Sequence, residues 1–138
     1  MRTAIVSDAH LHDPHSARQR EFVGFVDGLE ADRLILLGDI FHAWGGFAAT
    51  SPLCVGPALK AFRRLHGRGV PVTFVPGNHE LRAGSLLEEQ LAWTVREAHL
   101  DDAPGRRVLF AHGDEADTRA GYRGLSRLLR SPLFMSCL

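Results

Sequence analysis

Short apolar runs alternate with amphipathic segments along this chain. Four runs rich in Val, Ile, Leu or Phe have the length and composition of buried β-strands. We expect these strands at residues 3–7, 33–37, 70–75 and 107–111, and a further, less apolar strand at 94–98. Between them, apolar positions recur every three or four residues, which is the spacing of a helix that buries one face. The amphipathic segments lie at residues 16–29, 57–66, 85–91 and 118–130.

This alternation predicts an α/β fold in which helices flank a β-sheet. Ser16 is a typical cap for the first helix, and Gly67 is a typical residue to end the second. Residues 41–56 are expected to form a loop, because glycines and Pro52 interrupt the pattern there. The 138 residues have the length of one domain.

Composition narrows the possible partners and locations. The 16 basic and 16 acidic residues cancel, so nothing favours bulk electrostatic binding to nucleic acid. Two cysteines do not make a disulfide framework or a zinc motif. No apolar run reaches the roughly 18 residues of a transmembrane helix, and the start of the chain has no signal-peptide pattern. A cytoplasmic location is therefore expected.

Four polar clusters each follow a predicted strand. In open α/β sheets, ligands bind at the carboxyl ends of the strands, so the clusters should converge on one edge. Their Asp, His and Asn side chains suit a pair of divalent metal ions. The clusters are Ser7-Asp8-Ala9-His10, Gly38-Asp39, Gly77-Asn78-His79-Glu80 and His112-Gly113-Asp114.

The clusters divide into two sets of candidate ligands. Asp8 and His10 are two residues apart, so in an extended segment they point the same way. Asp39 could bridge two cations through its two oxygens. Asn78 offers a neutral oxygen and His112 a nitrogen, which together could begin a second metal site. Mixed oxygen and nitrogen ligands suit Mn²⁺, Fe²⁺ or Zn²⁺.

Such a site would favour phosphoryl chemistry. Two cations roughly 3.5–4 Å apart clamp a phosphoryl oxygen and lower the pKa of a shared water. His79 is expected to donate a proton to the leaving oxygen or to stabilise charge on the phosphoryl group. Each cluster taken singly is also an ordinary polar turn. All four together, each after its own strand, indicate metal chemistry.

Asp8-x-His10, Gly38-Asp39, Gly77-Asn78-His79-Glu80 and His112-Gly113 resemble the motifs of the calcineurin-like metallophosphoesterases, in order and in spacing. The resemblance implies a two-metal site and a metal-activated water. It implies that Asp8 and His10 bind one metal, that Asp39 bridges, and that Asn78 and His112 bind the other. Asn78 and His79 would then also face the reacting phosphoryl group. Mn²⁺ is the first expectation, with Fe²⁺ or Zn²⁺ as alternatives.

Three segments, 7–11, 38–44 and 112–114, are similar to the UDP-2,3-diacylglucosamine hydrolases (diphosphatases) of lipid A synthesis. So is the later pattern of Gly121-Tyr122 followed by Arg127, Arg130 and Pro132. That resemblance implies hydrolysis of the pyrophosphate in a nucleotide-lipid substrate, with peripheral contact to the cytoplasmic face of the inner membrane. It makes residues 118–138 the start of a helical cap. Tyr122 and Arg123 would stand at the entrance of the cap and contact substrate.

The chain also departs from these hydrolases. His79-Glu80 replaces their usual Arg-Asp, and His42 stands where they usually have Glu. His42 is therefore either a loop residue or a partner that orients a ligand. No histidine follows His112, so the family's later Gly-His-x-His is missing. Residues 1–138 are therefore expected to be an incomplete phosphoesterase domain that is weakly active or inactive alone. The alternatives are another phosphomonoesterase or phosphodiesterase of the superfamily, and a non-catalytic metal-binding remnant.

Overall fold

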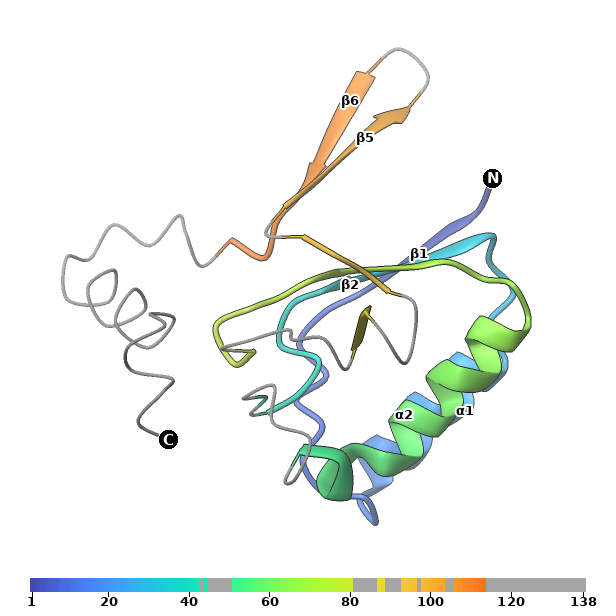
Figure 1. Ribbon diagram of the computed structural model, residues 1–138, viewed down its shortest axis with the longest axis vertical. Helices are drawn as coiled ribbons and strands as arrows, with labels where there is room; N and C mark the ends of the chain where they lie inside the picture. The colour runs from blue at the N-terminus through green and yellow to red at the C-terminus, as the bar shows by residue number, and fades with distance from the viewer. Residues whose placement is uncertain are drawn as a thin grey trace, which may run out of the picture.

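The computed structural model describes residues 1–42, 44, 51–80, 87–88, 93–96, 98–103 and 106–113. Its main feature is a parallel sheet of four strands in the order β1-β2-β3-β4 (Figure 1). The α/β layered fold expected from the sequence is confirmed. The strands are β1 (Thr3–Val6), β2 (Arg33–Leu37), β3 (Val72–Val75) and β4 (Thr94–Val95).

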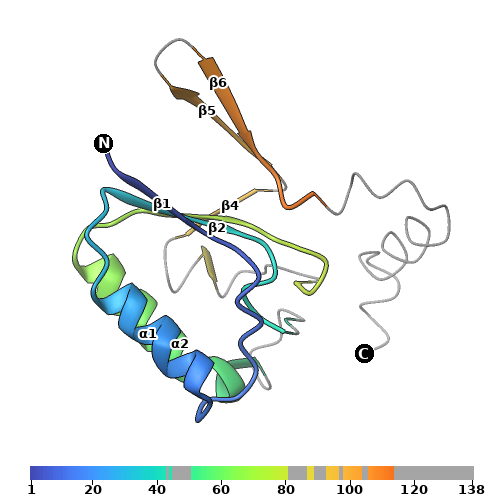
Figure 2. The same cartoon turned by 180° about the vertical axis from the view of Figure 1, so that it is seen from behind.

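Two helices cover one face of this sheet. Helix α1 (Ala17–Asp27) follows β1, and helix α2 (Ser51–Gly67) follows β2; Figures 1 and 2 show both on the same side. The hydroxyl of Ser16 accepts a hydrogen bond from the Gln19 amide at 3.1 Å, so the predicted cap of α1 is confirmed. The two helices pack through Phe22 and Phe62, whose ring centroids lie 5.8 Å apart.

The core lies between the helices and the sheet. Side chains of a strand alternate between its two faces, so Leu34 and Leu36 of β2 pack with Phe74 of β3 on the helical side. Trp93 closes this layer with its ring 4.7 Å from that of Phe62, centroid to centroid. The strand pattern read from the sequence thus places the correct residues in the core.

Several segment boundaries differ from the sequence expectation. The strand expected at 94–98 ends at Val95. The loop expected over residues 41–56 is wrong from Ser51 onward, where α2 begins. Pro52 lies in the first turn of α2, where backbone N–H groups have no acceptor within the helix, so a proline costs no hydrogen bond. Pro57 is inside the helix and does not end it. The third strand begins at Val72 rather than residue 70. The predicted helix at 118–130 lies outside the described residues.

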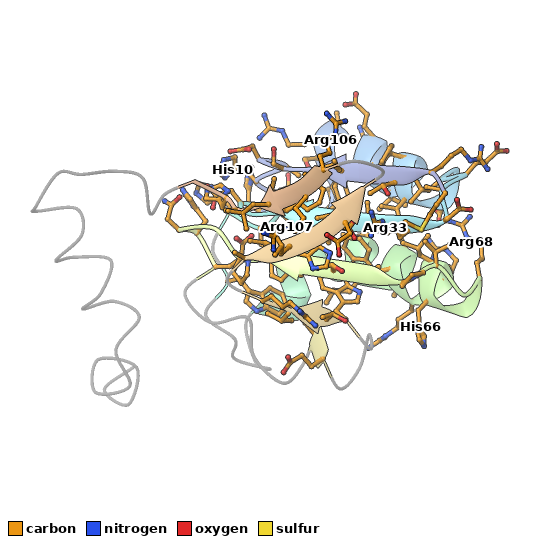
Figure 3. The ribbon with its side chains drawn as sticks, turned by 90° about the horizontal axis from the view of Figure 1, so that it is seen from above. His10, Arg33, His66, Arg68, Arg106 and Arg107 are labelled. Atoms are coloured by element: carbon orange, nitrogen blue, oxygen red, sulfur yellow. The ribbon has the colours of Figure 1, made fainter. Side chains whose placement is uncertain are left out.

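The last two strands form a separate antiparallel hairpin. Strand β5 (His99–Ala103) was not expected as a strand, and β6 (Arg106–Phe110) corresponds to the run predicted at 107–111. Figure 3 shows the hairpin lying over the face of the sheet opposite the helices. An ion pair between Arg33 of β2 and Asp101 of β5 joins the two sheets. No helix in the described part of the chain is long and apolar enough to cross a bilayer.

Candidate metal centre

The loops that leave β1 and β2 remain hydrogen-bonded to each other beyond the strands. The Asp8 amide donates to the Gly38 carbonyl at 3.0 Å, and the His10 amide donates to the Asp39 carbonyl at 2.9 Å. The Leu11 amide continues the series to Ile40 at 2.9 Å. Because this pairing extends the parallel ladder, it fixes Asp8, His10 and Asp39 at the carboxyl edge of the sheet.

Three candidate ligands adopt a backbone conformation that is uncommon for residues other than glycine. The φ angles are 54° at Asp8, 45° at His10 and 53° at Asp39, and these are the only non-glycine residues with positive φ among those the structure describes. Such residues cost roughly 1–3 kcal/mol each and cluster at functional sites. The strain therefore marks this edge independently of the side chains.

The carboxylate of Asp39 lies at the centre of the candidate ligands. Its Oδ1 is 3.6 Å from Nε2 of His112, and its Oδ2 is 3.9 Å from Nε2 of both His10 and His79. These separations are too long for hydrogen bonds. Metal bonds of about 2.1 Å place two ligand atoms of one ion up to about 4.2 Å apart, so the spacing fits ligands around cations.

The donor set itself fits a divalent ion. Asp8, His10 and Asp39 each offer a ligand atom within 4.8 Å of the others. Carboxylate oxygens and imidazole nitrogens are the donors expected for Mn²⁺, Fe²⁺ or Zn²⁺. Asn78 lies half-buried in the turn beside His79. The structure therefore gathers the predicted first metal set.

His112 reaches the same edge from the hairpin. It follows β6, which is not part of the parallel sheet, so the expectation that all four clusters end strands of one sheet is wrong. Nδ1 of His112 lies 3.1 Å from the Leu37 carbonyl. A carbonyl only accepts, so Nδ1 carries the proton and Nε2 is free to bind a metal. This arrangement is common in metal-binding histidines.

Glu80 holds the centre together, a role that the sequence did not indicate. It is 2% exposed, and it accepts backbone hydrogen bonds of 2.8 Å from Asp39, Phe41 and Gly77. Burial raises the pKa of the Glu80 carboxyl, against the three amides that lower it, and the charge of Asp39 adds to the rise. Glu80 thus fastens the loop after β2 to the turn after β3. The only available signal was its place in Gly77-Asn78-His79-Glu80.

Two glycines let the loops approach this closely. A Cβ on Gly77 would overlap Oδ1 of Asp39 and lie 2.9 Å from Nε2 of His112. A Cβ on Gly38, whose φ is +74°, would overlap the ring of His112. Any side chain at either position would displace a candidate ligand. The space that the ligands need therefore explains why glycine stands before Asp39 and before Asn78.

His79 is oriented by the backbone of His42. Its Nδ1 lies 2.5 Å from the His42 carbonyl, so Nδ1 donates and Nε2 is the free nitrogen. The backbone carbonyl of His42 thus orients His79, which is not one of the predicted metal ligands. The amide of His79 also donates to Oδ1 of Asp39 at 3.0 Å. Tyr122 and Arg123, the predicted substrate contacts, lie outside the described residues.

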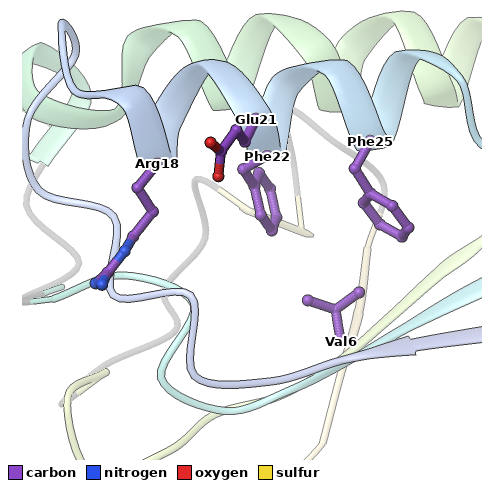
Figure 4. Close-up of a pocket in the computed structure, with 5 residues that line it drawn as sticks. All are labelled: Val6, Arg18, Glu21, Phe22 and Phe25. Atoms are coloured by element: carbon purple, nitrogen blue, oxygen red, sulfur yellow. The ribbon is translucent and has the colours of Figure 1, made fainter.

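An apolar cavity of about 320 Å³ opens beside the start of this loop system. Val6 ends β1 two residues before Asp8, and Phe22 and Phe25 of α1 face it across the cavity (Figure 4). Arg18 and Glu21 provide the polar part of the lining. The volume is at the lower end of the range for small-molecule pockets.

Comparison with known families identifies the superfamily. Residues 1–131 match the model of the calcineurin-like phosphoesterase superfamily domain. The chain belongs to this superfamily, as the motifs had suggested.

Among curated proteins, the chain is similar to UDP-2,3-diacylglucosamine hydrolase of Pseudomonas putida strain F1, with 33% identity over 133 residues. It is 32% identical over 137 residues to the hydrolase of that name from Serratia proteamaculans. These alignments cover 94% and 96% of this chain but 55% and 57% of the relatives. Among solved structures, Pseudomonas putida nuclease MPE matches 69% of this chain and 47% of its own, with 22% identity and a TM-score of 0.48.

Proposed function

We propose that this chain carries the metal-binding part of a phosphohydrolase that cleaves a phosphate ester or pyrophosphate bond. The observation that carries the proposal is the Asp39 carboxylate, which has three imidazole nitrogens 3.6–3.9 Å from its oxygens. Membership of the calcineurin-like phosphoesterase superfamily supports the reaction class. The chain spans about 55% of the length of the curated relatives, so the activity of the whole protein is part of the proposal.

In this proposal the ligands divide as the sequence predicted. Asp8 and His10 hold one divalent ion, Asn78 and His112 hold the other, and Asp39 lies between them. A bound pair of ions supplies Lewis acidity and lowers the pKa of water to near neutrality. Glu80 holds Asp39 in place through the backbone, so the ligands are positioned before any ion binds.

His79 is the proposed proton donor. Its Nδ1 is occupied by the His42 carbonyl, so only Nε2 can face a substrate. When protonated, Nε2 gives its proton to the leaving oxygen or donates a hydrogen bond to the phosphoryl group. Asn78 is proposed to contact the same phosphoryl group through its amide.

For the substrate we propose a nucleotide-lipid of the kind named in the relatives, UDP-2,3-diacylglucosamine. Two features support an apolar substrate: the names of the relatives, and the cavity lined by Val6, Phe22 and Phe25. Tyr122 and Arg123 are proposed as further substrate contacts, and a lipid substrate would bring the protein to the inner membrane surface. Mn²⁺ is the proposed metal. A phosphomonoester or phosphodiester substrate is the alternative that the superfamily allows.

The test compares two substrates and two variants. Purified protein with Mn²⁺ is assayed on UDP-2,3-diacylglucosamine and on bis-p-nitrophenyl phosphate. We expect weak turnover of the first, reduced at least about 100-fold by Asp39→Asn and unchanged by Asp102→Asn in the hairpin. Preference for bis-p-nitrophenyl phosphate would support the phosphodiesterase alternative. Absent turnover with Mn²⁺ binding that depends on Asp39 would leave a metal-binding remnant, and Mn²⁺ binding unaffected by Asp39→Asn would refute the site.

A further inference from the structure

Four histidine rings lie close to one another beside the metal centre, more than the proposed reaction uses. His10 and His79 have ring centroids 4.8 Å apart, and His42 lies 5.4 Å from His79 and 6.0 Å from His10. His12 lies 5.4 Å from His42. Imidazoles this close are a common basis for binding transition-metal ions.

Three of these rings present free nitrogens to one another. His10, His42 and His79 each offer a ligand atom within 4.8 Å of the other two. The exposed His42 side chain can rotate to shorten that spacing toward the roughly 4.2 Å limit for one ion. The Nδ1 of His79 is fixed on a carbonyl, which leaves Nε2 for an ion. Nε2 of His10 lies 3.9 Å from Oδ2 of Asp39, as does Nε2 of His79.

We propose that His10, His42 and His79 form a nitrogen-only site for Zn²⁺ and similar borderline ions, in competition with the carboxylate site. Imidazole suits Zn²⁺ and Cu²⁺, whereas carboxylate and carbonyl oxygens suit Mn²⁺. The two groups share His10, so an ion in the three-histidine site withdraws that ligand from Asp8 and Asp39. It also occupies Nε2 of His79. Mn²⁺ would therefore support the proposed phosphohydrolase, and Zn²⁺ would inhibit it.

His42 is the residue that separates the two sites. It belongs to the three-histidine group and not to the group of Asp8, His10 and Asp39. His42→Ala removes the ring but keeps the backbone carbonyl that orients His79. The side chain is exposed, so the variant should fold. The matched control is His66→Ala, which removes an exposed imidazole at the end of α2, at the opposite end of the molecule from His10 (Figure 3).

The experiment measures metal binding alone. Protein purified without a histidine tag is titrated with Zn²⁺ and Mn²⁺ against a chromophoric chelator. We expect His42→Ala to weaken Zn²⁺ binding at least about tenfold and to leave Mn²⁺ binding within about twofold. His66→Ala should change neither. Electron paramagnetic resonance of bound Cu²⁺ should show one coordinated nitrogen fewer in His42→Ala than in the unmodified protein.

Unchanged Zn²⁺ affinity and an unchanged Cu²⁺ nitrogen count in His42→Ala would overturn the proposal. Equal weakening of Zn²⁺ and Mn²⁺ would overturn it too, because it would place His42 in a single shared site. These readouts need no turnover, so they stand apart from the test of the phosphohydrolase. Where hydrolysis is measured, His42→Ala should be less inhibited by Zn²⁺ than the unmodified protein.

Discussion

The carboxyl edge of the parallel sheet and the β5–β6 hairpin are built in opposite ways. At the edge, buried polar groups fasten the loops: Asp39 and Glu80 are 5% and 2% exposed, and each is held by backbone amides. In the hairpin, the cross-strand pair of Leu100 and Leu109 is 54% and 64% exposed. Among the residues that the structure describes, the ion pair between the hairpin and the sheet is Arg33–Asp101.

This difference indicates that the fold fixes the candidate ligands at the carboxyl edge of the sheet more firmly than it fixes the hairpin. Backbone conformations that cost free energy persist only where the surroundings over-determine them, and Asp8, His10 and Asp39 all lie at the edge. Among the described residues, the contribution of the hairpin to the site is His112, which follows β6 and is secured by the Leu37 carbonyl. Substitutions at the edge should therefore change metal binding, and substitutions in the hairpin should not.

Gly77→Ala should have the largest effect. The added methyl group would overlap Oδ1 of Asp39 and press on Nε2 of His112, so two ligands move at once. We expect a loss of about 1–3 kcal/mol in the free energy of unfolding and at least about tenfold weaker Mn²⁺ binding. Denaturant titration and chelator competition measure the two quantities.

The matched control is Gly24→Ala in α1, where a methyl group would meet nothing within 4 Å. It should stabilise the protein by up to about 1 kcal/mol, because alanine favours the helix. Normal Mn²⁺ binding by Gly77→Ala would show that the loops adjust to the added methyl group. The edge would then be no more rigidly built than the hairpin.

Glu80→Gln should have the next largest effect. One oxygen becomes an NH₂ group that faces a backbone N–H, which leaves donors unpaired at a cost of about 1–3 kcal/mol. Burial disfavours the charged carboxylate and so raises the pKa of Glu80. Because glutamine is neutral, the substitution removes this unfavourable burial of charge and offsets part of the cost. The net loss in unfolding free energy should therefore be smaller than for Gly77→Ala. Thermal unfolding is the measurement.

Glu30→Gln provides the comparison on the surface. Glu30 pairs with Arg2 at 4.0 Å, and its side chain is 87% exposed. Its loss should change stability by less than about 0.5 kcal/mol. A Glu80→Gln variant as stable as Glu30→Gln would mean that Glu80 does not fasten the two loops.

The sequence predicted the edge better than the hairpin for a physical reason. Strands β1, β2 and β3 are buried apolar runs, and the polar residues that follow them must emerge at one edge. Strand β5 begins His99-Leu100-Asp101-Asp102, with few apolar positions, and it is defined by pairing with β6. The Pro104-Gly105 pair was the one local sign of a turn before β6.

Two further features were beyond sequence patterns. Glu80 reads as a polar turn residue until the fold brings three amides to its oxygens. The gathering of His42 and His79 depends on hydrogen bonds between loops: the His42 amide donates to the Leu11 carbonyl, and Nδ1 of His79 donates to the His42 carbonyl. By contrast, the gathering of Asp8, His10 and Asp39 could be predicted, because each follows a strand of the parallel sheet. His112 reaches the same edge from the hairpin, which the strand pattern did not indicate.

Asp101→Asn should have the smallest effect and should stay within the hairpin. The hydrogen bond and charge of Arg33 lower the pKa of Asp101 from its ordinary value of 3.8. A lowered pKa in the folded protein adds stability above the unfolded value, and that stability is lost as the pH falls through the folded pKa. Hydrogen exchange of the β5–β6 amides should therefore quicken, relative to the intrinsic rate, below about pH 4.

Asp101→Asn should abolish this pH dependence, and the adjacent Asp102→Asn should keep it. Mn²⁺ affinity should be unchanged in both variants; a loss in Asp101→Asn alone would show that the Arg33 pair positions His112, and that the hairpin belongs to the metal centre after all.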